Sequence, residues 1–91
     1  MAQSPGEQVR ASVEGFLAGA NISGRACAQR LRRGIDALCD CNQRWADAVQ
    51  AQCDEAAKGM DRAIRTDDEA MLIDIPVTLA EQLEWLAEAY R

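Results

Sequence analysis

The chain has 91 residues, of which 48% are hydrophobic, 27% charged and only 4% aromatic, and its net charge is −5. This composition is too apolar for a disordered tail, allows one small domain, and argues against a nucleic-acid partner. Because histidine is absent, the commonest general base and metal ligand is missing, and we expect no enzyme activity, no metal and no cofactor.

The amino-terminal residues predict an α-helix over residues 5–19. Ser4 is a suitable cap, Pro5 suits the first helical position, and Glu7 follows three residues after the cap. Residues 19–24 contain two glycines, an asparagine and a serine, which favour a turn over a weakened hinge. No basic segment followed by an apolar run precedes this helix, and no apolar run is long enough to span a bilayer. We therefore expect a cytoplasmic protein without a transmembrane segment, with thiol cysteines.

Residues 25–65 contain no proline and predict one long amphipathic helix of about 60 Å. Its apolar residues fall within an arc of about 100° on a helical wheel, and charged residues occupy the opposite side. The apolar set consists of Cys27, Leu31, Ile35, Leu38, Trp45, Val49, Cys53, Ala56, Met60 and Ile64.

Part of this apolar stripe alternates spacings of four and three residues, which is typical of a coiled coil. Asn42 and Gln52 interrupt the seam. Two interpretations of Asn42 stay open: a solvated position in a loose bundle, or a buried amide that fixes register and strand number.

The remaining residues, 67–91, predict a helix that returns beside the long one. Thr66 and Glu69 form a second capping box that begins it. Pro76 either kinks this helix or splits it, with a third capping box at Thr78 beginning the second part. The segment 71–75 also has strand character, but the chain offers it no partner strand. The expected fold is therefore all-α: one domain over 1–91, a helical hairpin with a short amino-terminal helix.

The cysteines and a basic cluster each allow two interpretations. Cys27 and Cys53 suit core positions and Cys39 and Cys41 flanking ones, or else they form a cross-chain disulfide or a shared metal site. The four arginines between residues 25 and 33 form a solvated helix face, or they meet an anionic partner. The aromatic residues Trp45, Trp85 and Tyr90 lie on or beside apolar stripes and favour core packing.

The segment 35–50, IDALCDCNQRWADAVQ, followed by CDEAA at 53–57, resembles the long amphipathic helix of phasins. Phasins are small helical proteins that coat polyhydroxyalkanoate granules in bacteria. The resemblance covers roughly residues 25–91 and rests on composition and periodicity. It implies a non-catalytic coat protein on the granule surface that self-associates through coiled-coil contacts.

Two functions are therefore expected from the sequence: a phasin-like granule coat that forms a homo-oligomer, or a small helical subunit that docks on a larger protein. In both, an apolar stripe too large for this short chain to cover is the interaction surface. The stripe consists of Leu31, Ile35, Leu38, Asn42, Trp45, Val49, Cys53, Ala56, Met60, Ile64, Leu79, Leu83, Leu86 and Tyr90.

Overall fold

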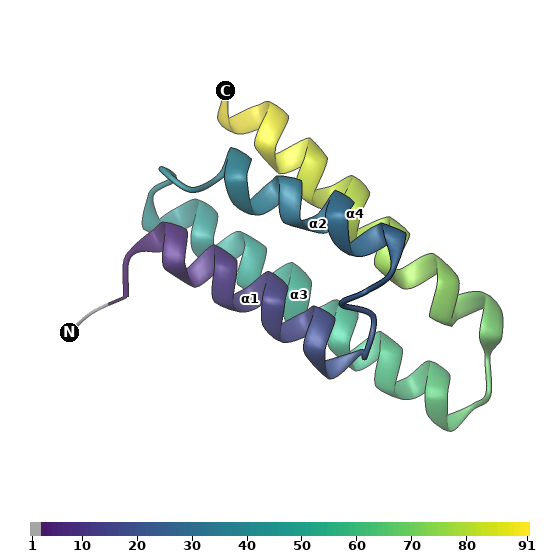
Figure 1. Cartoon of the computed structure of the whole chain (residues 1–91). Helices are drawn as coiled ribbons and strands as arrows, with labels where there is room; N and C mark the ends of the chain where they lie inside the picture. Colours follow the sequence, from purple (N-terminus) through teal and green to yellow (C-terminus); the bar gives the residue numbers. More distant parts are fainter. Residues whose placement is uncertain (1–2) are drawn as a thin grey trace.

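Four α-helices make up the computed structural model, which describes residues 3–91 (Figure 1). They are α1 (Pro5–Gly19), α2 (Ala26–Ala37), α3 (Gln43–Arg65) and α4 (Glu69–Tyr90). The described residues form no strand, so the predicted all-α class is confirmed.

Two helical hairpins, α1–α2 and α3–α4, pack face to face to form the bundle. Helix α1 contacts α2 and α3, and α4 contacts α2 and α3, so α1 and α4 lie on one diagonal. Glu14 on α1 pairs with Arg32 on α2, and Trp45 on α3 lies against Tyr90 on α4. Helices within each hairpin are therefore antiparallel, as Figure 1 shows.

The first helix begins as the sequence predicts. The Ser4 hydroxyl accepts a hydrogen bond from the Glu7 N–H at 3.2 Å, with Pro5 at the first helical position. At the other end, Asn21 adopts a left-handed conformation with φ of 58°. The Ile22 N–H then reaches the Leu17 carbonyl at 3.0 Å, which ends the helix in a Schellman arrangement. The predicted turn is confirmed, although asparagine rather than glycine takes the left-handed position.

The prediction of one unbroken helix over residues 25–65 is wrong. The chain leaves the helix after Ala37, reverses through residues 38–42, and begins α3 at Gln43. The Asn42 side chain accepts a hydrogen bond from the Trp45 N–H at 3.3 Å and so caps α3. Asn42 is exposed and is therefore not a buried seam amide. The helical break lets both halves of the stripe pack on one shared core.

The start of the returning helix also differs from the prediction. Thr66 is the C-cap of α3, and Asp67 follows in a left-handed conformation with φ of 54°. Asp68 is the N-cap of α4, because its carboxylate accepts from the Met71 N–H at 3.2 Å. The cap of α4 therefore lies two residues later than expected, and it is a single N-cap rather than a capping box, because Met71 cannot return a hydrogen bond.

Helix α4 runs without a break through Pro76, so the alternative of two separate helices is wrong. A proline inside a helix lacks the N–H that would bond to the carbonyl four residues earlier. Pro76 is buried, and so are Leu79 and Ala80 on the next turn. Packing of this apolar face against the core offsets the missing hydrogen bond and keeps the segment helical.

The core lies between the four helices and is entirely apolar among the described residues. Its largest fully buried side chains are Leu17, Leu31, Leu38, Leu79, Leu83, Val9, Val13 and Val49. Gly34 allows α2 and α4 to approach closely, since a Cβ there would lie 3.3 Å from the Leu83 Cβ.

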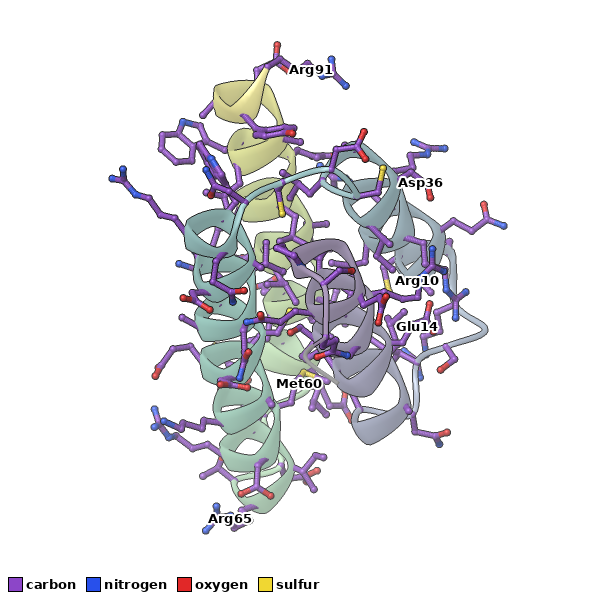
Figure 2. The ribbon with its side chains drawn as sticks, turned by 90° about the vertical axis from the view of Figure 1, so that its left-hand side faces the viewer. Arg10, Glu14, Asp36, Met60, Arg65 and Arg91 are labelled. Carbon is purple, nitrogen blue, oxygen red and sulfur yellow. The ribbon has the colours of Figure 1, made fainter. Side chains whose placement is uncertain are left out.

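The two hairpins differ in length. Helices α3 and α4 have 23 and 22 residues, whereas α1 and α2 have 15 and 12. The α3–α4 turn therefore extends beyond the end of the other hairpin (Figure 1). Figure 2 shows Arg65 at this tip, past the last turn of α1.

Candidate interaction surface

The predicted interaction stripe is the interior of the bundle. Its members on α2, α3 and α4 point toward each other, so the chain covers most of the stripe itself. The expectation that the stripe stays uncovered is therefore wrong. The buried members are Leu31, Ile35, Leu38, Val49, Cys53, Met60, Leu79 and Leu83, and Trp45, Ala56, Leu86 and Tyr90 are partly buried against them.

Two stripe members lie outside this core. Asn42 is the exposed cap of α3, and Ile64 is 60% exposed near the tip of the α3–α4 hairpin. Ile64 shares the face of α3 that α1 covers, but α1 ends at Gly19 before it can cover the last turn. Helix length, rather than helix periodicity, leaves this side chain uncovered.

Trp45 and Tyr90 connect the end of α4 to the start of α3 and to the α2–α3 connection. The rings of Trp45 and Tyr90 meet edge to face, with centroids 5.8 Å apart. The Tyr90 hydroxyl donates to the Asp40 carbonyl at 2.9 Å, which joins the end of α4 to the α2–α3 connection. Both residues therefore have structural partners within the chain, as the core-packing interpretation expects.

The four cysteines are free thiols in the structure. Burial raises the pKa of the Cys41 thiol, and it raises that of Cys53 to about 12, which keeps Cys53 protonated at neutral pH. Cys39 is exposed and Cys27 is half-buried. Within residues 3–91, no three cysteine or carboxylate side chains lie together in a way that would hold a metal ion.

Two of the four clustered arginines bind carboxylates of other helices. Arg30 holds Glu84 of α4 through two hydrogen bonds of 2.9 and 2.7 Å. Arg32 holds Glu14 of α1 at 2.7 and 3.2 Å. These contacts lower the pKa of each glutamate, because the guanidinium stabilises the charged carboxylate. The pairs tie α2 to both neighbours, a role that neither interpretation of the cluster included.

A polar cluster links the starts of α1 and α3. The Gln8 amide donates to the carboxylate of Asp47 at 3.0 Å and to the side-chain oxygen of Gln50 at 2.7 Å. Gln43 donates to the same Asp47 carboxylate at 2.8 Å. These hydrogen bonds lower the pKa of Asp47. The cluster is exposed and satisfied within the chain, so it fixes helix register and offers no reactive group.

A groove of about 330 Å³ runs between α3 and α4. It lies on the outer face of the hairpin, because the opposite flank of α3 faces α1 and the Leu83 flank of α4 faces α2. Its walls mix small, apolar and polar side chains from both helices: Gln52, Glu55, Ala56, Gly59, Met71, Asp74, Ile75, Thr78, Leu79 and Gln82.

Large apolar side chains remain exposed only on the α3–α4 hairpin among the described residues. Trp85 is 69% exposed, and its helical position continues the groove wall formed by Thr78 and Gln82. Nearer the tip, Ile73 is 64% exposed and Met71 is 43% exposed, with Val77 and Ile64 nearby in sequence on the same hairpin. Trp85 is the most exposed of these side chains, and its position beside the groove makes this part of the hairpin the candidate interaction surface.

This surface is the feature that sequence reasoning missed. The wheel placed Trp85 beside an apolar stripe and suggested core packing, whereas α1 and α2 lie on the other side of the hairpin. A signal was present in the sequence, since on a helical wheel Trp85 lies about 120° from Leu79 and about 160° from Leu83. Only the arrangement of the helices shows which of these faces is covered.

No family model matches the chain, and searches among curated proteins and solved structures also give no match. The fold therefore defines the class of the protein directly as an all-α four-helix bundle. Over the described residues, no helix has both the length and the apolar character that a membrane crossing requires.

Proposed function

We propose that the protein is a non-catalytic interaction module that docks on a protein partner through the outer face of the α3–α4 hairpin. The observation that carries this proposal is Trp85, whose indole is 69% exposed beside the groove between α3 and α4. Tryptophan is costly to expose and is enriched among residues that dominate binding energy at interfaces. The rest of the bundle supports the surface by holding the hairpin rigid.

A granule coat of the phasin type is the second candidate, and a different surface favours it. The tip of the hairpin exposes Ile64, Met71, Ile73 and Val77, which form an apolar end beyond α1 and α2. Such an end would insert into a polymer surface without opening the bundle, while the acidic chain repels neighbouring particles.

Photo-crosslinking of the full chain in its native cells tests the docking proposal. A photoreactive phenylalanine analogue is placed at position 85, and a matched control carries it at the exposed Gln29 of α2. We expect a protein adduct from position 85 and none from position 29. Excess wild-type chain should compete with the adduct, whereas the Trp85→Asp chain should not. Equal labelling from both positions would contradict the proposal.

The same variants separate the two candidates when they are mixed with polyhydroxyalkanoate particles in low salt. A coat protein should bind the particles, lose binding in Ile64→Asp/Ile73→Asp, and keep it in Trp85→Asp. Failure of the wild-type chain to bind would rule out the coat function and leave protein docking.

A further inference from the structure

The outer face of the α3–α4 hairpin carries charges of opposite sign on its two sides. On the α3 side, Arg44 and Arg62 are exposed, and no carboxylate within residues 3–91 forms an ion pair with either. Glu55 and Lys58 lie between them and pair with each other at 3.5 Å, so they compensate one another. The α3 side is therefore basic overall.

The α4 side of the same face is acidic. Asp74 lines the groove, and Glu81 and Glu88 follow it at spacings of seven along the outer edge of α4, between the exposed Trp85 and the α2-facing Glu84. All three are exposed, and none has an ion-pair partner in the described part of the chain. Glu84 faces α2 instead, where it binds Arg30.

The register of the hairpin sets which charges share a level along its axis. Trp45 lies beside Tyr90, and a Cβ on Gly59 would lie 3.0 Å from the Ile75 Cδ1. Two residues that face each other across α3 and α4 therefore have residue numbers that add up to about 135. By this register Arg62 is level with residues 72–74, and Arg44 lies within one turn of the level of Glu88.

A two-fold axis parallel to the helices of the hairpin leaves each residue at the same level along the axis and exchanges the α3 side with the α4 side. It places α3 of a second copy over α4 of the first, and the reverse, as in any isologous contact. Arg62 of one copy then meets Asp74 of the other, and Arg44 meets Glu88. A two-fold axis across the hairpin would instead place α3 on α3, where basic residues meet basic residues.

The same axis gives the exposed indole a receiving surface. Trp85 is level with residues 49–50 of α3, so in the dimer it lies over Ala48 and Ala51 of the second copy. Both alanines share the outer face of α3 with Gln52 and Glu55 of the groove wall. Their small side chains leave room for a large ring, and an aromatic anchor in such a position is typical of an interface centre.

From these observations we propose that the partner of this surface is a second copy of the chain, in a two-fold dimer that packs α3 of each copy on α4 of the other. The inference rests on the proposed docking function and names its partner. Helices of this length and width offer roughly 600 Å² per copy, at the low end for specific interfaces. We therefore expect a dissociation constant on the order of micromolar.

Sedimentation equilibrium of complementary charge variants tests this geometry. Arg44→Glu/Arg62→Glu makes both sides acidic, and Asp74→Lys/Glu88→Lys makes both sides basic. Each variant alone should dimerise at least about tenfold more weakly than wild type, because both charge pairs, each repeated by the two-fold axis, then bring like charges together. An equimolar mixture should recover a dimer of wild-type affinity, since each acidic side then meets a basic one.

A matched control is Arg25→Glu/Arg33→Glu, which changes the net charge by the same amount as Arg44→Glu/Arg62→Glu. Its two positions are exposed and lie outside this face, so it should leave dimerisation unchanged. A wild-type chain that stays monomeric at millimolar concentration, or a mixture that fails to recover the dimer, would overturn the inference. If an adduct of another protein still forms from position 85, the docking function stands and only the second copy is excluded. If the wild-type chain neither dimerises nor gives a protein adduct from position 85, the docking function is excluded as well.

Discussion

At Gly6 the start of α1 lies directly against the backbone of the α2–α3 connection. A Cβ built on Gly6 would overlap the carbonyl oxygen of Cys39 and lie 3.0 Å from its carbonyl carbon. Backbone atoms cannot move aside as a flexible side chain can. Gly15, in the same helix, has nothing within 4 Å of such a Cβ. These two glycines therefore have different physical roles, although a sequence shows only two glycines in a helical segment.

Replacement of Gly6 and of Gly15 by alanine should have opposite effects on the free energy of unfolding. Gly6→Ala should lower the free energy of unfolding by about 2 kcal/mol, because the methyl group forces α1 away from the connection. Gly15→Ala should raise it by about 0.5–1 kcal/mol, since alanine loses less conformational entropy in a helix. Urea unfolding followed by circular dichroism measures both. Equal effects of the two changes would contradict the close approach at Gly6.

Helix ends were predictable where local hydrogen bonding decides them. Ser4 caps α1 as expected, because its hydroxyl satisfies an N–H that no helical carbonyl can reach. The break at residues 38–42 escaped prediction because it contains neither glycine nor proline. In addition, the apolar residues after the break continue the helical spacing of those before it. Both helices bury the same face against a common core, so a wheel cannot distinguish them from one helix. The cap formed by Asn42 was the available signal.

Asn42 therefore distinguishes a capped helix from a continuous one. Asn42→Leu should lower the free energy of unfolding by about 1 kcal/mol, because the Trp45 N–H loses its acceptor. Asn42→Asp is the control and should retain most of the stability, since aspartate caps equally well. In an unbroken coiled-coil helix, leucine at this seam position would instead stabilise the chain or enlarge its assembly. Thermal unfolding and mass measurement by light scattering would detect either result.

At the level of the whole molecule, the sequence predicts the composition of the core better than the location of the surface site. The predicted stripe contains Leu31, Leu38, Val49, Leu79 and Leu83, all of which are fully buried. What covers them is the packing of one hairpin on the other, which depends on the reversal after α2. The exposed tip follows from the unequal lengths of the hairpins, and the exposed outer face follows from the side on which α1 and α2 pack, so the pattern of a single helix could not have located either one.

This division predicts that members of one sequence stripe respond differently to truncation. Leu38→Ala should lower the free energy of unfolding by about 2–5 kcal/mol, because Leu38 is fully buried and its removal leaves a cavity. Ile64→Ala should change it by about 0.5 kcal/mol or less, because Ile64 is 60% exposed at the tip. Chemical denaturation of both variants, at a concentration below the expected dimer dissociation constant, measures the stability of the monomer alone. Similar losses in the two variants would mean that another part of the chain covers Ile64, which would contradict its exposure at the tip.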